Sequence, residues 1–366
     1  MSKKTVMICA GGTGGHMFPA LALANDLLSR DCEVVMITDE RTVKYTQGHD
    51  KLIVHVIKSS SFPSGLIGKI KGLALLMVGY FQSQRLISKY QPDIAIGFGG
   101  YPSLPPMVAA QRRNVSTVIH EANAILGRAN AYLAPKATRI ALSLQDMSSV
   151  RDEDIPRAVV TGNPIRSDIA ALYTHPYNSP DTDTDFRITV MGGSLGAKVM
   201  ANHVPKALAA LPEDLKVRLN ITQQCHEEDI EHVKKTYTDA GITASLKQFI
   251  DDVPEVLKQT HLVIARSGAS TVAEVSVAGI PAIYIPYPHH ADHQQRVNAE
   301  SISKQGGAWV IEQKDLSSSV LAKRIEGLMR SPEALFKAAE AARSCAKPEA
   351  TRKLGNLVIA LIKGWS

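Results

Sequence analysis

The sequence contains few cysteines, and none of them lies close to another. Its four cysteines are Cys9, Cys32, Cys225 and Cys345, and they form no Cys-x-x-Cys pair. This spacing indicates no disulfide framework, so we expect a reduced, cytoplasmic protein. The first residues, Met-Ser-Lys-Lys, lead directly into an apolar strand pattern, and we therefore expect no signal peptide.

The chain also lacks a hydrophobic run long enough to cross a bilayer. Within the apolar region 62–81, the part without a charge is residues 72–81, which is about half the length that a membrane span needs. Lys69 and Lys71 lie in this region, and Arg85 follows it. Two interpretations are open: a helix buried in the core, or an exposed apolar patch with a basic rim that lies on a membrane surface.

Neither composition nor charge is extreme. Hydrophobic residues make up 45% and charged residues 21% of the chain, as in ordinary globular proteins. The net charge of +6 fits an anionic substrate or a membrane surface, and it is equally compatible with neither. The length of 366 residues predicts two domains of about 150 to 200 residues each.

A glycine-rich turn near the N-terminus is the strongest local signal. An apolar run over residues 6–10 is followed by Gly-Gly-Thr-Gly-Gly and then by a helical Ala/Leu pattern over 20–28. Glycines let backbone amides approach a ligand closely, and the helix start adds the positive end of its dipole, so we expect this turn to bind an anion. His16 stands at the helix start and is the first candidate base.

Two further loops are expected at the same edge of a parallel sheet. The strand pattern 93–97 ends in Phe-Gly-Gly-Tyr-Pro, and the pattern 116–120 ends in His-Glu-Ala-Asn. Ligands bind beyond the carboxyl ends of such strands, so we expect these loops to line one cleft. Each residue also has a structural interpretation: Tyr101 shapes a turn, and His120 forms a hydrogen-bonded pair with Glu121.

The opening pattern is repeated in the second half of the chain. Residues 187–211 again read as strand, glycine turn and helix, after a polar stretch at 173–185. We therefore expect an α/β fold of two Rossmann-like, doubly wound domains that face each other across a cleft. The expected boundaries are 1–162 for the N-terminal domain, 163–343 for the C-terminal domain, and 344–366 for a helix that packs back on the N-terminal domain.

The stretch 261–274 in the second half is the most informative for ligand binding. Gly268 permits a tight turn, Ser270 or Thr271 can cap the next helix, and Glu274 lies one turn along it. A carboxylate at this place can accept hydrogen bonds from the two hydroxyls of a ribose. The alternative, equally open from the spacing, is the acidic member of a capping box.

A cluster of histidines at 289–293 resembles a metal site but has the wrong spacing. It contains no His-x-x-x-His or His-Glu-x-x-His pattern, and a solvated loop at a helix start explains it better. We expect no metal there. Gln294 and Gln295, in the first turn of that helix, can bond to sugar hydroxyls.

Taken together, these segments closely resemble the MurG family of bacterial N-acetylglucosaminyltransferases, which complete the lipid-linked disaccharide precursor of peptidoglycan. Seven motifs carry the resemblance over essentially the whole chain, in the family's order. They are GGTGGH (11–16), GFGGYPS (97–103), HEAN (120–123), GNPIR (162–166), MGGSLGA (191–197), FIDD (249–252) and RSGASTVAE (266–274). Two departures are Ala122, where many relatives carry glutamine, and the loop 287–291. The first concerns contacts on the acceptor side, and the second concerns the placement of Gln294.

The resemblance implies a GT-B glycosyltransferase without cofactor or metal. Its donor would be UDP-N-acetylglucosamine, and its acceptor undecaprenyl-diphospho-N-acetylmuramoyl-pentapeptide. The implied donor-binding residues are Thr13, Gly14, Gly15, Asn123, Arg166, Ser194, Ile250, Ala269, Ser270, Thr271, Val272, Ala273, Glu274 and Gln294; the implied acceptor-binding residues are Gly12, Tyr101 and His120. Within the donor set, the Ile250 backbone would read the uracil, Glu274 the ribose, and Ser194 with Thr271 the diphosphate.

The chemistry implied is an inverting transfer of N-acetylglucosamine. The C4 hydroxyl of the acceptor attacks the anomeric carbon in line with the departing UDP, so a base must stand on the acceptor side. His16 is the candidate base, because imidazole titrates near neutral pH, and Glu121 is the competing candidate. The leaving diphosphate would be stabilised by helix-terminal amides.

A lipid-linked acceptor favours the membrane interpretation of region 62–81. We therefore expect a peripheral protein at the cytoplasmic face of the bacterial inner membrane, in contact with anionic lipid. Cell-wall and division proteins are further possible partners, and no nucleic acid is expected.

Three rival functions are open. An NAD-dependent oxidoreductase would use Asp39 for the ribose, but the first turn lacks the last glycine of the G-x-G-x-x-G pattern. An inactive sugar-nucleotide-binding protein would show a damaged site, whereas His16, Glu121, Ser194 and Glu274 are all present. A sterol or antibiotic glycosyltransferase would differ in its acceptor, and the motifs HEAN and GFGGYPS argue against it.

Overall fold

The computed structural model describes residues 3–60, 65–145, 149–288 and 293–365. The chain divides into two compact units. The first consists of Met1–Arg166 together with Glu349–Ser366, and the second of Ser167–Pro348. The domain limits expected at residues 162 and 343 stay predictions.

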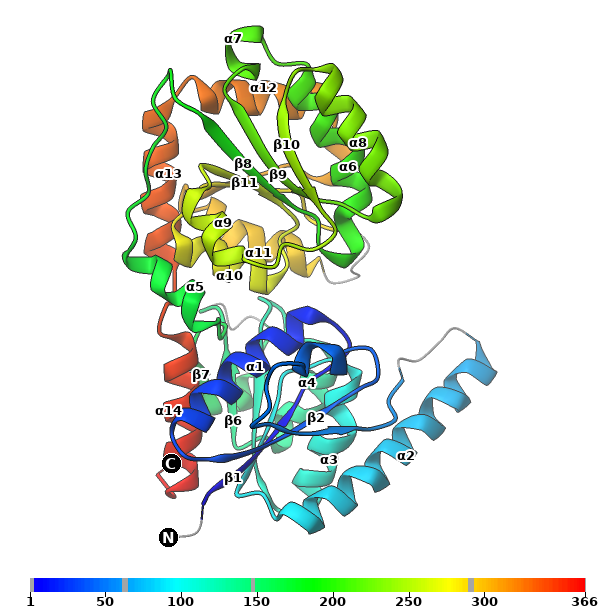
Figure 1. The fold of residues 1–366 in the computed structure, drawn as a ribbon. Helices are drawn as coiled ribbons and strands as arrows, with labels where there is room; N and C mark the ends of the chain where they lie inside the picture. Colours follow the sequence, from blue (N-terminus) through cyan, green and yellow to red (C-terminus); the bar gives the residue numbers. More distant parts are fainter. Residues whose placement is uncertain (1–2, 61–64, 146–148, 289–292, 366) are drawn as a thin grey trace. The chain divides into compact units, whose positions relative to one another are not determined.

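The first unit is built on a seven-stranded parallel sheet in the order β3-β2-β1-β4-β5-β6-β7. Figure 1 labels four of these strands, β1, β2, β6 and β7. Its strands are β1 (Thr5–Cys9), β2 (Glu33–Thr38), β3 (Ile53–Val56), β4 (Ile94–Gly97), β5 (Ser116–Glu121), β6 (Arg139–Leu142) and β7 (Ala158–Val160). Its longer helices are α1 (Gly14–Ser29), α2 (Leu66–Tyr90), α3 (Leu104–Arg112), α4 (Arg128–Leu133) and α14 (Ala350–Ile362). The strand order changes direction between β1 and β4, which makes this pair the switch point of a doubly wound sheet.

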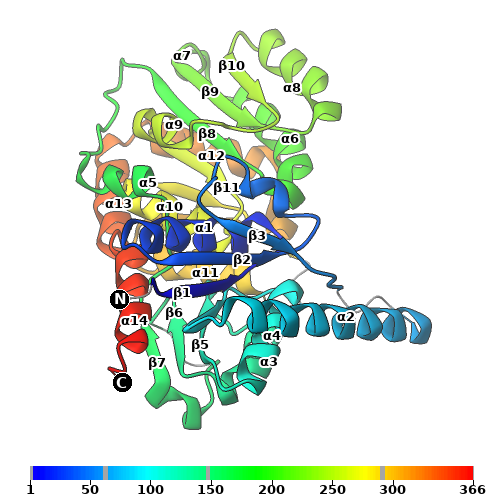
Figure 2. The same cartoon turned by 60° about the horizontal axis from the view of Figure 1, so that its bottom comes forward.

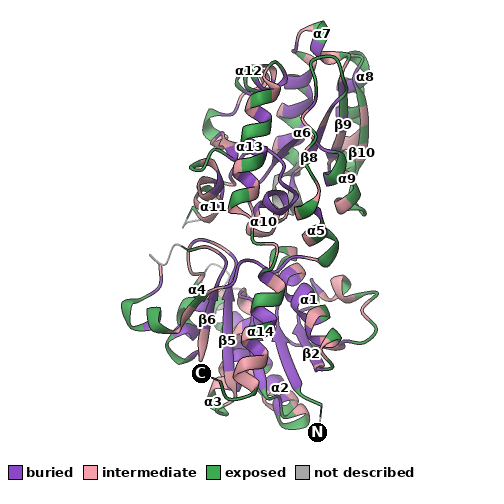
Figure 3. Cartoon of the chain, turned by 90° about the vertical axis from the view of Figure 1, so that its left-hand side faces the viewer, coloured by how far each residue is buried: buried purple, intermediate pink, exposed green. Residues whose placement is uncertain are grey.

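The core of the first unit forms two layers, one on each face of the sheet. In β1, Val6 and Ile8 belong to the cluster that includes α1, whereas Met7 and Cys9 belong to the cluster that includes α3. All of β1 is buried, and apart from Thr5 it is apolar, as expected for a parallel strand covered by helices on both faces. Figure 3 shows the strands β2 and β5 of the same sheet as largely buried.

The C-terminal helix α14 packs against α1 in this unit. Leu354 and Val358 are fully buried in the same cluster as Leu27. The Arg30 guanidinium donates a hydrogen bond of 2.7 Å to Asn356 Oδ1. The last turns of the chain thus complete the core of the first unit.

The second unit repeats the design with a six-stranded parallel sheet in the order β10-β9-β8-β11-β12-β13. Its strands are β8 (Phe186–Met191), β9 (Leu219–Gln224), β10 (Thr243–Lys247), β11 (Leu262–Ala265), β12 (Ala282–Tyr284) and β13 (Ala308–Val310). Its helices are α5 (Ser167–Ala171), α6 (Gly193–Ala209), α7 (Glu213–Lys216), α8 (Glu227–Asp239), α9 (Val253–Gln259), α10 (Ala269–Ala278), α11 (Gln294–Ser303), α12 (Ser318–Met329) and α13 (Pro332–Cys345). The switch point lies between β8 and β11, so the expected doubly wound α/β class is confirmed for both units.

Helix α2 contains most of the apolar region 62–81, and it is not a core helix along its whole length. Its N-terminal half projects beyond the sheet of the first unit (Figures 1 and 2). Among the described side chains of α2, the exposed large apolar ones are Ile70, Leu73, Met77, Val78 and Phe81, each between 47% and 61% exposed, whereas Leu76 is buried. Among the described residues, no helix is both long enough and apolar enough to cross a membrane.

Candidate active site

The first glycine turn connects β1 to α1 at the switch point of the first unit. Gly12 has a φ of +85°, a conformation that side chains rarely adopt. A Cβ atom on Gly11 would lie 2.8 Å from Cβ of Pro102, which follows β4. The turn therefore packs closely against the loop Gly99–Ser103, and both loops lie at the carboxyl edge where doubly wound sheets bind ligands.

Asp39, directly after β2, holds this turn in place. Its Oδ1 accepts hydrogen bonds from the Gly12 amide at 3.3 Å and from the Thr42 hydroxyl, and its Oδ2 accepts from Arg41 at 2.8 Å. Burial alone would raise the pKa of this carboxyl, but the hydrogen bonds from Thr42, Arg41 and Gly12 together lower it. Asp39 is thus a buried, ionised group that positions the turn.

His16 lies in the first turn of α1, against the backbone of the loop after β4. Gly99 and Gly100 have φ values of +83° and +73°. A Cβ atom on either glycine would lie within 3.4 Å of the His16 ring. These two positions therefore need glycine both for their backbone conformation and for the approach of the imidazole.

The surroundings of His16 favour its neutral form. Burial lowers its pKa, whereas the charge of Glu121 and a hydrogen bond to the backbone of Phe98 raise it in part, so that the net direction is downward. An imidazole with a lowered pKa is free of its proton at neutral pH. His16 can therefore accept a proton there.

The Glu121 carboxylate is only 4% exposed and is occupied by its own loop. Oε1 accepts hydrogen bonds from the backbone and side-chain nitrogens of Asn123 at 3.0 and 3.1 Å. Oε2 accepts from the Gly127 amide at 2.9 Å and from Asn130 Nδ2 at 2.8 Å. The arrangement holds the segment after β5 in a fixed conformation and leaves the carboxylate little capacity to take a proton from a substrate.

His120 is completely buried, and its side chain does not reach the surface. Its Nε2 lies 3.2 Å from the carbonyl oxygen of Gly162, and burial lowers its pKa to about 4. The expected contact between this side chain and the acceptor does not fit this placement. The structural alternative fits in part, but the partners of the ring are Gly162 and Ser143, not Glu121.

The other expected residues of the first unit gather at the same edge of the sheet. Gly12, Thr13, Gly14 and Gly15 form the turn and the start of α1, Tyr101 begins the short helix after β4, and Asn123 follows β5. Gly14 and Tyr101 are half-buried, and Thr13 and Gly15 are exposed. The loops after β1, β4 and β5 thus come from adjacent strands of one sheet.

In the second unit, the loops after β8 and β11 flank the switch point. Ser194 lies in the first turn of α6, and its side chain is outside the described part of the structure. After β11, Gly268 is the N-cap of α10, without a side-chain cap. Ala269, Ser270 and Thr271 then form the first turn of that helix, and Arg166, which ends the first unit, is half-buried.

Glu274 lies on the same side of α10 as Ser270 and Thr271, because residues three and four positions apart share a helix face. All three are half-buried, whereas Val272 is in the core. Since the N-cap is Gly268, the third helical position is Thr271. The capping-box interpretation of Glu274 is therefore wrong, and ribose binding stays a prediction.

Arg266 was not expected as an organising residue, yet it joins three loops of the second unit. Its guanidinium is buried and donates to the carbonyl oxygens of Ile285 and Pro286, both at 2.9 Å, and to Gln313 at 2.7 Å. Burial lowers its pKa. Ser267 donates to the Gln295 carbonyl oxygen at 2.7 Å and so connects this loop to α11.

The remaining expected contacts of the second unit are distributed around these loops. Ile250 is buried, so only its backbone is available to a base. Gln294 begins α11 and is half-buried, and Gln295 Oε1 already accepts from the Tyr287 amide at 3.0 Å. Residues 289–292, which contain most of the histidine cluster, lie outside the described residues. In the described part of the chain, no group of three or more potential ligands could hold a metal.

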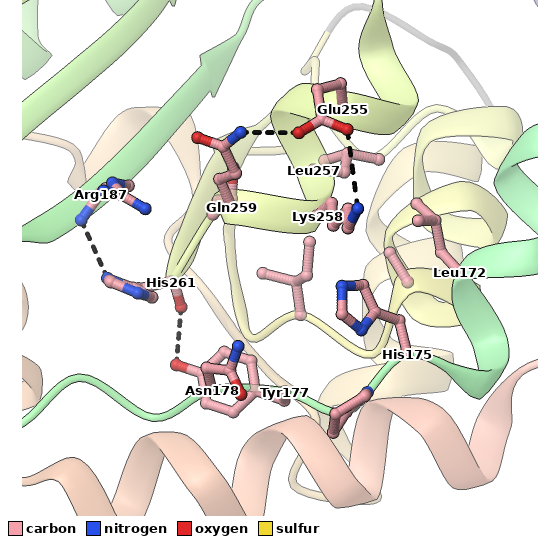
Figure 4. A pocket seen from close by; sticks show the side chains of 14 residues that line it. Leu172, His175, Tyr177, Asn178, Arg187, Glu255, Leu257, Lys258, Gln259 and His261 are labelled. Atoms are coloured by element: carbon pink, nitrogen blue, oxygen red, sulfur yellow. Dashed lines mark hydrogen bonds and ion pairs between the residues drawn. The ribbon is translucent and has the colours of Figure 1, made fainter.

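The second unit also contains a cavity of about 350 Å³, which lies at the amino ends of its strands (Figure 4). Arg187 and His261 lie on one side of it, and the ion pair of Glu255 and Lys258 lies on another. The Arg187 amide donates to Nδ1 of His261 at 3.0 Å, and burial lowers the pKa of His261 to about 4. Because sheets of this type bind ligands at the opposite edge, we do not assign the donor to this cavity.

Comparison with known proteins agrees with this architecture. Residues 6–142 match the model of the glycosyltransferase family 28 N-terminal domain, and residues 187–354 match that of the C-terminal domain. A UDP-N-acetylglucosamine--N-acetylmuramyl-(pentapeptide) pyrophosphoryl-undecaprenol N-acetylglucosamine transferase of Rhodospirillum centenum is 43% identical and covers 98% of this chain and 95% of its own. The protein of that name from Paramagnetospirillum magneticum is 42% identical and covers 100% and 98%.

A solved structure supports the same relationship. MurG of Acinetobacter baumannii superimposes with a TM-score of 0.78 at 29% identity, covering 97% of this chain and 99% of its own. These relatives of one family therefore match the chain over nearly its full length. The chain belongs to glycosyltransferase family 28.

Proposed function

We propose that the protein transfers N-acetylglucosamine from UDP-N-acetylglucosamine to the C4 hydroxyl of a lipid-linked N-acetylmuramoyl-pentapeptide. The relatives that are more than 40% identical carry this activity in their names. The observation in the chain itself that carries the proposal is the packing of His16 against Gly99 and Gly100, beside a glycine turn. It combines a base with a place for a phosphorylated substrate.

In the reaction, the acceptor oxygen forms a bond to the anomeric carbon of the donor sugar. The bond between that carbon and the β-phosphate oxygen of UDP breaks, and UDP leaves with the electron pair. His16 takes the proton of the acceptor hydroxyl, and the configuration at the anomeric carbon is inverted because attack is in line with the leaving group.

We assign the base to His16 in preference to Glu121. The carboxylate already accepts four hydrogen bonds from Asn123, Gly127 and Asn130. The imidazole is neutral at neutral pH because of its burial, and it gains some basicity from the charge of Glu121. Glu121 then acts through His16 and through the loop that it holds.

We assign the donor to the second unit and the acceptor to the first. The starts of α6 and α10 at the switch point supply helix-terminal amides for the diphosphate of UDP, and Glu274 supplies a carboxylate for the ribose. The turn around Gly12 and the loop that contains Tyr101 receive the acceptor. Thr13, Gly14, Gly15, Asn123, Arg166 and Gln294 are proposed as donor contacts, as the family resemblance implies.

An oxidoreductase function has no support from the geometry. Asp39 would have to hold the ribose of NAD, but it is only 4% exposed and accepts hydrogen bonds from Gly12, Thr42 and Arg41. Its carboxylate is thus committed to the protein.

We also propose that the exposed face of α2 brings the protein to the membrane that contains the acceptor. Leu73, Met77 and Phe81 are about half exposed, and the lysines at 69 and 71 lie at the same end of the helix. Apolar side chains with a basic rim bind anionic lipid surfaces. The protein would then act as a peripheral protein at the cytoplasmic face of the inner membrane, where cell-wall and division proteins are potential partners.

The test is transfer of radiolabelled N-acetylglucosamine from UDP to a lipid-linked muramoyl-pentapeptide, with EDTA present. We expect turnover in the wild type and none with an acceptor whose C4 hydroxyl is blocked. Absence of turnover by a folded protein that still binds the donor would contradict the proposed acceptor, and a requirement for added metal would contradict the mechanism.

A further inference from the structure

Arg41 lies next to the glycine turn but belongs to none of the motifs that indicated the site. It follows β2, which pairs with β1 in parallel, so both strands end at the same edge of the sheet. A Cβ atom on Gly12 would lie 3.8 Å from Nη2 of Arg41. The guanidinium therefore lies beside the turn that we assign to the acceptor.

Arg41 is held there by a buried acid. Its Nε and Nη2 both lie 2.8 Å from Oδ2 of Asp39, while Oδ1 of Asp39 binds the Gly12 amide. The Asp39 side chain is 6% exposed and the Arg41 side chain 61%. One edge of the guanidinium is thus fixed to the protein, and the remaining N–H groups are on the accessible side.

The charges around the turn explain why a cation is needed at this position. Asp39 is ionised and touches the turn through Gly12, so without a neighbouring cation it would repel a phosphate bound there. The adjacent acid, Glu40, forms an ion pair of 2.6 Å with Lys58. Arg41 neutralises Asp39 and presents a second edge to solvent.

The chemistry of that edge fits a phosphate group. A guanidinium donates parallel hydrogen bonds to phosphate oxygens, and an arginine pre-positioned by a carboxylate loses little conformational freedom on binding. The substrate proposed for the first unit carries one diphosphate, between its lipid and its sugar.

We infer that Arg41 binds the diphosphate of the lipid-linked acceptor, positioned beside the glycine turn by Asp39. The inference rests on the proposed function, because that function supplies the diphosphate. The donor diphosphate is bound by the other unit and is not a ligand of Arg41.

The experiment compares steady-state kinetics of the wild type, Arg41→Ala, Arg41→Lys and the matched control Lys44→Ala. Lys44 is an exposed cation three residues further along the same segment. We expect Arg41→Ala to raise the acceptor KM about tenfold or more while the donor KM stays unchanged. Arg41→Lys should give a smaller increase, and Lys44→Ala none. An unchanged acceptor KM in folded Arg41→Ala would overturn the inference.

The double variant Arg41→Ala/Asp39→Asn distinguishes two roles of Arg41: direct contact with the diphosphate, and neutralisation of the charge of Asp39. If Arg41 touches the diphosphate, the acceptor KM stays high after the negative charge of Asp39 is removed. Recovery of the wild-type KM would mean that Arg41 only masks Asp39, and it would contradict direct binding.

Two further outcomes separate the alternatives. Binding to vesicles that contain phosphatidylglycerol should be the same for Arg41→Ala and the wild type; a parallel loss would assign Arg41 to bulk lipid and overturn the inference. Failure of the wild type to use the acceptor would instead contradict the proposed function, so the two failures are distinguishable.

Discussion

The two units place the same strand, turn and helix at their switch points, but they stabilise these loops with opposite charges. In the first unit, the buried carboxylates of Asp39 and Glu121 hold the loops around His16. In the second, the buried guanidinium of Arg266 holds the loops around α10. A nearby anion favours the protonated form of a base, and a nearby cation favours a bound anion. This difference agrees with the roles that we propose, a base in the first unit and a bound donor diphosphate in the second.

The largest expected effect comes from His16→Ala, which removes the proposed base. We expect kcat to fall by about 10² to 10⁴, the usual contribution of a positioned base. Measurement of transfer at saturating donor and acceptor tests this. If the variant keeps more than half of the wild-type kcat, His16 is not the base.

Glu121→Gln tests whether the buried carboxylate both stabilises the fold and raises the pKa of His16. The change keeps the shape of the side chain, but the new amide replaces an acceptor of hydrogen bonds from Asn130, Gly127 and Asn123. We expect a loss of about 3 kcal/mol in the free energy of unfolding, measured by urea denaturation.

The same variant has a second readout in the pH profile. Without the charge of Glu121, the pKa of His16 falls further, so the acid limb of kcat/KM moves to lower pH. An acid limb that does not move would leave Glu121 with a structural role alone.

Glu274→Ala tests whether the second unit binds the ribose of the donor. If the carboxylate accepts hydrogen bonds from the ribose, the KM for UDP-N-acetylglucosamine should rise about tenfold or more, with the acceptor KM unchanged. Glu255→Ala is a suitable control, because Glu255 lies on α9 at the cavity by the amino ends of the strands. Equal effects of the two substitutions would contradict the ribose assignment.

The wild-type pH profile sharpens the assignment of the base. The pKa of His16 is lowered by burial from its ordinary value of 6.5. His16 loses its proton as pH rises through this lowered pKa, so the acid limb of kcat/KM should have its midpoint below pH 6.5. An acid limb with its midpoint above 6.5 would contradict the neutral histidine in the free enzyme.

The smallest effect on chemistry is expected from the exposed face of α2. Replacing Leu73, Met77 and Phe81 by serine should weaken binding to anionic vesicles severalfold and leave transfer in detergent unchanged, because these side chains are about half exposed. Leu76 is unsuitable for this test, since it is buried. Co-sedimentation with vesicles of phosphatidylglycerol gives the measurement, and unchanged binding would place the membrane contact elsewhere.

Most of the fold could be predicted from the sequence because its signals are local. Apolar runs that end in glycine turns mark β1, β4, β8 and β11, and they place both switch points. The short strands β6, β7 and β13, of three or four residues each, were not predicted.

The candidate site was predicted less completely, because the residues that hold its loops in place make contacts with residues far away in the sequence. Asn130 reaches Glu121 from α4, and Arg266 reaches Gln313 from another loop. His120 and Glu121 are neighbours in one motif, so the sequence indicates the same role for both. Because successive side chains of a strand point to opposite faces, the ring of His120 lies in the core. Burial of this kind follows from the packed sheet and cannot be read from the motif.

The central claim is that the first unit supplies the base and the second unit binds the donor. Calorimetric titration of UDP-N-acetylglucosamine, without acceptor, into His16→Ala and Glu274→Ala tests it most directly. The claim predicts wild-type donor affinity in His16→Ala, which has lost turnover, and weakened affinity in Glu274→Ala. Loss of donor affinity in His16→Ala together with wild-type affinity in Glu274→Ala would contradict it.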